Sequence, residues 1–595
     1  APATELRRHA QAALQELPEH LQPEALQRFA RSSNLNNSER DILRLLRDVK
    51  MMLPLNVSSI LCQALHVHYI SLATWFRYLL NVKNGGLLIG GFDIHDHFAG
   101  VCLREFWRSF AVDRAGHAVF DLHGSRLHRV VPFAVHLDEG RGLRKSAVLV
   151  VHAQTIFGAE TAPNFMEEFN FSWQEGLSDE KIGEIMRRNQ FHNARGSTYR
   201  TRMLYTVLPK ASYTKRNKNV YGAVLDQLRQ ECTDLLENGV RLRDGRRFYF
   251  CLVAVKGDAP ALAKAGNFTR NFQCLGNAIC WECMAGAPAV PFEDCRRAPL
   301  YEATMYAERP WCTAGPLAEV PGVPGIPEAV YRRDPFHVFK QALGGYYVAS
   351  SIVLVAELGY WEATQNSFDQ VMERSYADFL NYVRECSGRV VPHLKHFTRT
   401  NLHYARTSSF PYMRPKGSDV MLLTRWLGFL MHNGPYMEGE RKGSMIQNPL
   451  EEWHSELFQH IAAAAAGAVK FFRLMHNNGL WLSRVVAHDM AEGAFQFCEA
   501  YTSLATLCHN RRLSRYTLVP SLHYFHHFYV DLKKALSNPQ NQYISSPALA
   551  NCEGDEDYIG KICKISRHVH PLVTNRRTID RFLVRMNFVM EEGAA

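Results

Sequence analysis

The chain has 595 residues, of which 47% are hydrophobic and 21% are charged, and this balance excludes an intrinsically disordered protein. Its length allows large cores and suggests about three or four domains. The net charge of +10 favours contact with polyanions such as nucleic acid, although mildly basic enzymes that bind no nucleic acid are also common.

Cysteine usage and hydropathy indicate the cellular setting. The 14 cysteines show no regular disulfide spacing, which favours a reducing compartment. No apolar run approaches the ~20 residues that cross a bilayer, and the longest candidate, residues 461–469, is about half that length and mostly alanine. We therefore expect no contact with a membrane.

Residues 1–60 alternate helical patterns with breaks, and residues 61–81 are aromatic and helix-like, which together predict a helical N-terminal region over residues 1–84. Ser38 can cap one of these helices, because acidic residues occupy the turn that follows it. Glycine pairs at residues 85–86 and 90–91 then mark turns, so we expect a domain boundary near residue 84.

Residues 130–137 form an apolar run that predicts a strand ending at Asp138, and residues 147–151 begin a second strand. The two strands form a predicted hairpin with an acid at its first edge. A basic, aromatic-rich stretch follows, and it is typical either of a nucleic-acid surface or of a solvated loop. Its cations and rings are Arg195, Tyr199, Arg200, Arg202, Tyr205, Lys210, Tyr213, Lys215, Arg216 and Lys218.

An amphipathic helix over residues 221–238 leads into a buried strand over residues 248–255, which Gly257 and Asp258 close. The order is acid-bearing strand, strand, uncertain connector, helix, acid-bearing strand, helix. This order is that of an RNase H-like core, in which the first and fourth strands hold their carboxylates side by side. Two such carboxylates suit Mg²⁺, although acids at strand ends are also common as turn residues.

Cys280 and Cys283 form a CxxC pattern, which is either half of a zinc ligand set or a pair of buried thiols. If zinc binds there, two further ligands must converge on it, and the thiols available are Cys274, Cys295 and Cys312. A later cluster of His523, His526 and His527 could also ligate a metal. We favour packed histidines on a helix face as its explanation.

After a connector rich in proline and glycine, Asp334 suits an N-cap and Pro335 suits the first position of a helix. From there to about residue 536 the pattern is almost wholly helical, with apolar stripes that we interpret as core. The chain ends with an acidic stretch at residues 553–557 and a basic helix. Acids at a helix start complement the helix dipole, which explains them as well as a catalytic role does.

Four segments carry a resemblance to known proteins: VPFAVHLDEG, VAVKGDAPAL with ICWEC, DPFHVF, and GDEDYIGKICKISRHVHPLVTNRRTIDRFL. They resemble a large family of uncharacterised dinoflagellate proteins over most of the chain from about residue 85. Through those proteins the chain more distantly resembles eukaryotic cut-and-paste DDE/D transposases of the CACTA and hAT kinds. This resemblance implies an α/β fold, in which a large all-α insertion interrupts an RNase H-like mixed sheet core.

The resemblance also implies site residues. Asp138 matches the first acid of the triad and Asp258 the second, and Glu556 is our choice for the third, with Glu553 and Asp557 as rivals. These acids would hold a pair of Mg²⁺ or Mn²⁺ ions. The D-x-x-H motif that such families place at the entrance to the insertion is matched by Asp334 and His337. Zinc at Cys280 and Cys283 stays an open alternative.

The implied domains are residues 1–84 (helical), 85–270 (first part of the core), 271–333 (cysteine-containing connector), 334–550 (insertion) and 551–595 (a C-terminal helix that completes the core). The implied function is that of a transposase-derived nuclear protein that cleaves and transfers DNA strands, with DNA as partner and a homo-oligomer as a further possibility. The alternatives are an inactive DNA-binding or scaffold relic and a structure-selective nuclease. The expected DNA contacts are Arg200, Arg202, Lys215, Arg216, Lys561, Lys564 and Arg567.

Overall fold

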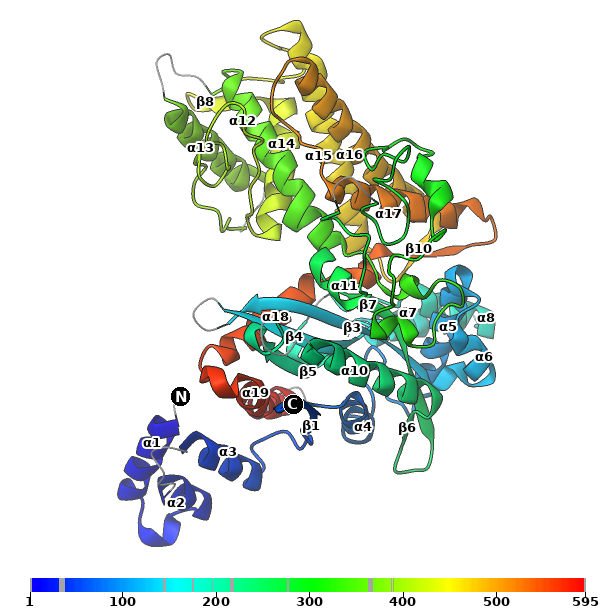
Figure 1. Cartoon of the computed structure of the whole chain (residues 1–595), viewed down its shortest axis with the longest axis vertical. Coiled ribbons are helices and arrows are strands. Elements are labelled where there is room, and N and C mark those ends of the chain that lie inside the picture. Colours follow the sequence, from blue (N-terminus) through cyan, green and yellow to red (C-terminus); the bar gives the residue numbers. More distant parts are fainter. Residues whose placement is uncertain are drawn as a thin grey trace.

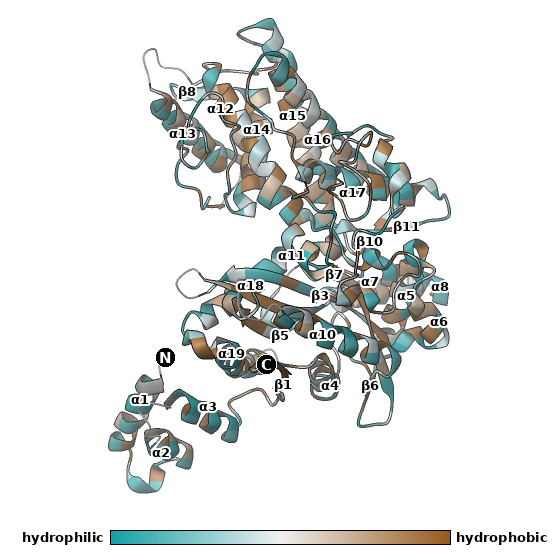
Figure 2. Cartoon of the chain, in the orientation of Figure 1, coloured by the Kyte–Doolittle hydropathy of each residue, from teal (hydrophilic) through white to brown (hydrophobic). Residues whose placement is uncertain are grey.

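The chain forms a mixed α/β structure with a sheet-containing half and a helical half (Figure 1). The computed structural model describes residues 3–31, 38–142, 146–173, 176–194, 196–214, 219–274, 278–361, 367–386, 388 and 390–592. In Figure 2 the three N-terminal helices are mostly hydrophilic, whereas the strands and helix α12 carry many hydrophobic residues. The two large halves therefore hold the main cores.

The N-terminal helices α1 (Ala3–Glu16), α2 (Glu24–Arg31) and α3 (Ser38–Asp48) contact one another. The predicted boundary at residue 84 lies too far along the chain, because the segment after α3 already packs on the sheet. The hairpin β1 (Ser58–Cys62) and β2 (Leu65–Tyr69) leads into α4 (Leu72–Val82). Within α4, Trp75 donates a hydrogen bond to the Leu204 carbonyl (2.9 Å), and Phe76 stacks on Phe250 with ring centroids 3.9 Å apart.

A five-stranded sheet with the order β5-β4-β3-β7-β6 forms the centre of the first half. Its strands are β3 (Val130–Arg141), β4 (Ala147–Thr155), β5 (Arg202–Pro209), β6 (Val240–Arg241) and β7 (Arg247–Lys256). β3 pairs with β4 in antiparallel fashion and with β7 in parallel, so the predicted hairpin is confirmed. The strands are apolar on both faces because helices cover both faces of this sheet.

The helices of this half are α5 (His97–Arg114), α6 (Ala118–His123), α7 (Thr161–Ser172), α8 (Asp179–Arg188), α9 (Thr198–Thr201), α10 (Asn219–Glu237) and α11 (Ala259–Ala265). The predicted helix over residues 221–238 is confirmed as α10. The basic stretch was expected as a nucleic-acid surface or a solvated loop, but residues 202–209 of it form the buried strand β5. Lys215 and Arg216 lie outside the described residues.

The helical half begins with the π-helix η9 (Phe336–Leu343), which continues into α12 (Gly344–Glu357). It goes on through α13 (Phe368–Cys386), α14 (Gly417–Asn433), α15 (Glu452–Asn477), α16 (Arg484–Asn510) and α17 (Pro520–Ser537). The region from residue 334 is therefore mainly helical, as predicted, but not almost wholly so, because residues 390–416 form no helix and a short hairpin lies at residues 436–441. Short strands β10 (Trp481–Ser483) and β11 (Tyr543–Ser545) pair near the sheet half.

One stretch of the described chain, Phe336–Glu357, is long and apolar enough to cross a membrane by length and composition. The expectation that residues 461–469 are the longest apolar candidate is therefore wrong. In this fold 78% of the apolar window within Phe336–Glu357 is buried inside the protein, as in a core helix.

The C-terminal segment returns to the sheet as two helices rather than the single helix expected. α18 (Glu553–Ser566) packs on β3, and α19 (Thr574–Glu592) packs on β5 and β2. Gly140 of β3 faces α18, whereas Phe133 of the same strand packs against Phe76 of α4. Because side chains alternate along a strand, α18 and α4 cover opposite faces of the sheet.

Candidate functional site

Asp138 and Asp258 lie at the same end of the sheet, just beyond the C-terminal end of the parallel pairing of β3 with β7. The parallel register of β3 and β7 ends at the pair His136 and Lys256, and each aspartate follows two residues later. β3 continues beside β4 at this point, while β7 leaves the sheet and enters α11. Asp258 caps α11, since its Oδ1 accepts a hydrogen bond from the Ala261 amide at 2.7 Å.

Glu556, one turn into α18, joins Asp138 at this edge. Donor atoms of Asp138, Glu556 and His136 all lie within 4.8 Å of one another, a spacing that a single metal ion can bridge. Among the described residues Asp258 is not part of this close group, because its carboxylate is turned toward the start of α11. Burial, and after it the charges of Asp258 and Glu556, raise the pKa of Asp138 well above its ordinary value. Such a crowded acidic site favours a bound cation.

The D-x-x-H motif supplies a positioned histidine to the same site. Asp334 is buried and accepts hydrogen bonds from the amides of Phe336 (2.9 Å) and His337 (3.1 Å), which makes it the side-chain cap of η9. It also contacts His337 Nδ1 at 2.6 Å, so Nε2 is the ring atom directed at the acids. That Nε2 lies 3.4 Å from Glu556 and 3.8 Å from Asp138. π-Helices are frequent at functional sites.

The charge state of His337 follows from these contacts. Burial lowers the pKa of His337, but hydrogen bonds with Asp334, Cys552 and Glu556 outweigh that effect and raise it well above its ordinary value. The backbone amide of Cys552 in turn donates to Asp334 at 2.9 Å. The motif therefore links the start of the helical half to the start of α18.

The other acids of α18 point elsewhere. Glu553 pairs with Lys340 at 2.9 Å, and Asp557 pairs with Lys561 at 2.6 Å and accepts from Thr198 at 2.7 Å. An α-helix advances by 100° per residue, so successive acids face different neighbours. Only Glu556 of the three candidates named from the sequence is directed at Asp138.

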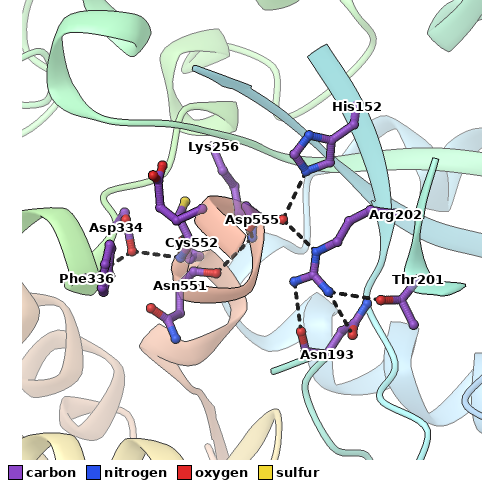
Figure 3. Close-up of polar contacts among 12 residues, drawn as sticks. His152, Asn193, Thr201, Arg202, Lys256, Asp334, Phe336, Asn551, Cys552 and Asp555 are labelled. Carbon is purple, nitrogen blue, oxygen red and sulfur yellow. Dashed lines mark hydrogen bonds and ion pairs between the residues drawn. The ribbon is translucent and has the colours of Figure 1, made fainter. Parts of the chain in front are cut away.

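Asp555 was missed by the sequence analysis, and it is the centre of a buried charge network (Figure 3). This fully buried carboxylate contacts Lys256 at 2.7 Å, Arg202 at 3.0 Å and His152 at 3.1 Å. Burial alone would raise the pKa of Asp555, but the charges of Lys256 and Arg202 hold it well below its ordinary value. The signal in the sequence was a lysine, an arginine and a histidine within apolar strands, because each buried cation needs a partner.

A second group of donors joins the connector to the helical half. Cys280 and Cys283 face His523 and His527 of α17, and all four side chains are buried. The Sγ atom of Cys280 lies 3.6 Å from His527 Nε2. The Sγ atom of Cys283 lies 3.4 Å from His523 Nε2 and 3.5 Å from His527 Nε2. The two Nε2 atoms are 3.0 Å apart.

These separations fit a tetrahedral zinc ion. Ligands at ~2.3 Å (sulfur) and ~2.0 Å (nitrogen) place sulfur about 3.5 Å from nitrogen, and the two nitrogens about 3.3 Å apart. The amide of Glu282 also donates to Cys280 Sγ at 3.4 Å, which is how backbone groups support a thiolate ligand. The rings of both histidines pack against Tyr301, with centroids 4.5 Å and 4.8 Å away.

The structure corrects one expectation about this group. The neighbours of the CxxC pair are His523 and His527, whereas Cys274, Cys295 and Cys312 do not join them among the described donors. The histidines are buried on α17, as the favoured explanation of packing requires, and two of them are also within reach of both thiols. The spacing of four residues on α17 was the signal, because it puts both rings on one side of a helix.

No protein-family model matches this chain, and no curated protein is detectably similar to it. The assignment of a function consequently depends on the arrangement of these side chains.

The residues expected to contact DNA have different environments. Arg202 is only 3% exposed and is bound to Asp555, so the prediction that it contacts DNA is wrong. Arg200 is half-buried on α9, and Lys561 pairs with Asp557. Lys564 of α18 and Arg567, the residue that follows the helix, are exposed and lie about 12 Å and 17 Å along the helix axis from Glu556 at 1.5 Å per residue.

Replacement of Gly140 by alanine is expected to push α18 away from β3. The added Cβ would lie 2.4 Å from Cys563 Sγ and 2.6 Å from Ile559 Cγ2, both on α18. Overpacking of this kind costs about 1–3 kcal/mol, and it would also move Glu556 relative to Asp138. We expect a lower thermal midpoint and weaker binding of divalent cations, measured by calorimetry.

Gly560→Ala is the matched control, because a Cβ at this exposed position of α18 meets no atom within 4 Å. It should be neutral or stabilise the helix by up to about 1 kcal/mol. If Gly140→Ala behaves like Gly560→Ala, the close contact of β3 with α18 is not present in solution.

Proposed function

We propose that this protein is a transposase-derived DDE/D enzyme that cleaves and transfers DNA strands. The observation that carries the proposal is the convergence of Asp138 and Glu556, with Asp258 close enough to interact with both carboxylates from the end of the adjacent parallel strand. Glu556 is separated from Asp258 by the whole helical half. Random surface acids would not be expected to meet in this way.

An RNase H-like core is part of the proposal. Its support is the part β5-β4-β3-β7 of the five-stranded sheet, in which β3 is central, antiparallel to β4 and parallel to β7. On this interpretation the two-residue strand β6 is an addition at the edge beyond β7, and β3 and β7 correspond to the first and fourth strands of such a core. Asp138 lies within β3, and Asp258 follows the end of β7. On this interpretation residues 334–550 are an insertion before the last acid. It is mainly helical rather than all-α as expected, because it also contains the short strands β8 (Tyr436–Met437), β9 (Glu440–Arg441), β10 and β11.

The ions would be held by Asp138 and Glu556, together with Asp258 at the start of α11. A pair of Mg²⁺ or Mn²⁺ ions would activate a water, and later a DNA 3′-hydroxyl, for in-line attack on a phosphate. Asp334 holds His337 by Nδ1, so that Nε2 stays directed at the acids. The raised pKa of His337 favours a positively charged ring beside these two carboxylates, a charge that a bound ion would supply instead.

A basic groove that reaches Glu553, one turn of α18 before Glu556, suits a DNA backbone. A groove of about 590 Å³ opens between η9, α13, α14 and α15, and Glu553 and Lys340 form part of its wall. Exposed Arg425 and Arg473 also line it. Cations contribute most of the affinity of proteins for DNA through contacts with phosphates. The proposal implies a nuclear protein with DNA as its partner, and it allows a homo-oligomer.

Zinc is proposed as a structural ion at Cys280, Cys283, His523 and His527. Four protein ligands without an open position are typical of structural rather than catalytic zinc. The ion would tie the connector after α11 to α17, and thereby hold the helical half against the half that carries Asp138.

The proposed activity is tested with a cleavage and strand-transfer assay on duplex DNA in Mg²⁺ or Mn²⁺. Wild-type protein is compared with two variants, Asp258→Ala and Asp557→Ala. Asp557→Ala is the matched control, because Asp557 is an acid of α18 that points away from the site and pairs with Lys561. We expect loss of at least about 100-fold for Asp258→Ala and little change for Asp557→Ala.

Other outcomes select the other candidates. DNA binding that is equal in all three proteins, without cleavage of substrates that include the cognate ends, would identify a DNA-binding or scaffold relic. Cleavage restricted to branched DNA, without strand transfer, would identify a structure-selective nuclease. Equal cleavage by wild type and Asp258→Ala would contradict the acidic site itself.

A further inference from the structure

His136 is a buried histidine whose ring nitrogens have no hydrogen-bond partner among the described residues. It lies two residues before Asp138 on β3, so both side chains project from the same face of the strand. A ring nitrogen of His136 belongs to the donor group of Asp138 and Glu556, within 4.8 Å of both carboxylates. Buried polar atoms without partners are rare in folded proteins, and each needs an explanation.

We propose that His136 is a metal ligand beside Asp138 and Glu556, and that this nitrogen makes the site selective for Mn²⁺ over Mg²⁺. The inference rests on the proposed function, because it concerns the same acids. Carboxylate and water ligands suit Mg²⁺, whereas an imidazole ligand favours a transition metal. Mg²⁺ also demands near-ideal octahedral geometry and keeps several of its waters, which a rigid buried ring restricts.

The surroundings of His136 suit a ligand. A ring nitrogen of His136 also lies within 4.8 Å of an oxygen of Asp555, whose charge is already balanced by Lys256 and Arg202. Metal-binding histidines are usually oriented by a carboxylate near their second nitrogen. Asp555 makes no hydrogen bond with His136 here, but it lies close to the ring, and its own ion pairs keep it from competing for the ion. His152, the cross-strand neighbour, packs on His136 with ring centroids 4.9 Å apart and limits its rotation.

The decisive measurement is made on the wild-type chain with zinc supplied and Mn²⁺ added. Pulsed electron paramagnetic resonance detects an imidazole nitrogen that is bound directly to Mn²⁺. We expect that signal in wild type and in His337→Gln, and its loss in His136→Gln. A wild-type complex that binds Mn²⁺ without a nitrogen signal would overturn the inference, and so would a signal that disappears in His337→Gln and persists in His136→Gln.

Binding affinities provide the second readout. His136→Gln should weaken Mn²⁺ binding by about tenfold or more while changing Mg²⁺ binding less, so that the preference between the ions falls. His454→Gln is the matched control, since His454 of α15 is also buried and its ring nitrogens also have no hydrogen-bond partner among the described residues, and it should leave the preference intact. Equal losses for both variants would overturn the ligand role in favour of a packing role.

Failure of the inference can be distinguished from failure of the proposed function. Asp138→Asn should abolish Mn²⁺ binding at this site if the acids hold metal at all. If Asp138→Asn has no effect on binding, the proposed function fails with the inference. If Asp138→Asn abolishes binding but His136→Gln keeps the affinity and the ion preference, only the role of His136 is refuted.

Discussion

Cys283→Ser is expected to release zinc from the protein and to lower its thermal midpoint by on the order of 10 °C or more. The zinc contributes folding free energy because the folded state binds it far more tightly than the unfolded chain does. Removal of one ligand loses most of that contribution and leaves Cys280 and two histidines facing one another in a buried space. Zinc content by mass spectrometry and thermal unfolding followed by circular dichroism measure the two effects.

Cys295→Ser is the matched control, because Cys295 is also a buried thiol of the connector but lies outside the donor group. It should keep about one zinc per chain. His527→Ala should also lose zinc, as Cys283→Ser does. This loss would not be expected if Cys280 and Cys283 were only ordinary buried thiols. Wild-type protein purified without zinc, or equal losses in Cys283→Ser and Cys295→Ser, would contradict the zinc site.

Asp555→Ala is expected to destabilise the sheet half by about 5 kcal/mol or more. The carboxylate balances two cations that are themselves buried, since the side chains of Lys256 and Arg202 are 1% and 2% exposed. Removal of one partner from a buried ion pair costs about 3–5 kcal/mol, and here two cations lose the same partner. Asp557→Ala should cost less than about 1 kcal/mol, because the Asp557 side chain is 52% exposed and solvent screens its ion pair with Lys561.

The pH dependence provides a further check on Asp555. Its pKa in the folded protein is depressed, so its contribution is present above the ordinary aspartate pKa and is lost as the pH falls toward the folded value. Urea unfolding of wild type and Asp555→Asn should therefore differ most at neutral pH. The difference should narrow below about pH 4. If the difference in unfolding free energy between wild type and Asp555→Asn is the same at neutral and acidic pH, Asp555 contributes through packing and not through its charge.

The paired aspartates could be predicted from the sequence because the signal is local. Residues 130–137 and 248–255 are apolar runs of strand length, and each run is followed by an acid. A helix between them is a typical connection of parallel strands, so Asp138 and Asp258 were expected at one edge. The register of β3 and β7, which ends two residues before each aspartate, agrees with that expectation.

The role of each acid on α18 could not be predicted in the same way. Glu553, Asp555, Glu556 and Asp557 are chemically similar, and their different environments depend on how α18 is rotated against β3. The contact of Cys563 and Ile559 with Gly140 sets that rotation. Asp555 consequently points into the sheet and Glu556 along its edge, a distinction that depends on packing between residues more than 400 positions apart.

The sequence by itself determined the elements of this protein: apolar strands closed by acids, a long helical region, a cap at Asp334 and a CxxC pattern. Each of these depends on side chains a few residues apart, whose spacing is visible in the chain. The tertiary structure alone decided which distant groups meet. It paired Cys280 and Cys283 with histidines some 240 residues away, buried Arg202 against Asp555 and brought His136 to Glu556. Contacts of this kind depend on the packing of whole helices and strands, which no local pattern records.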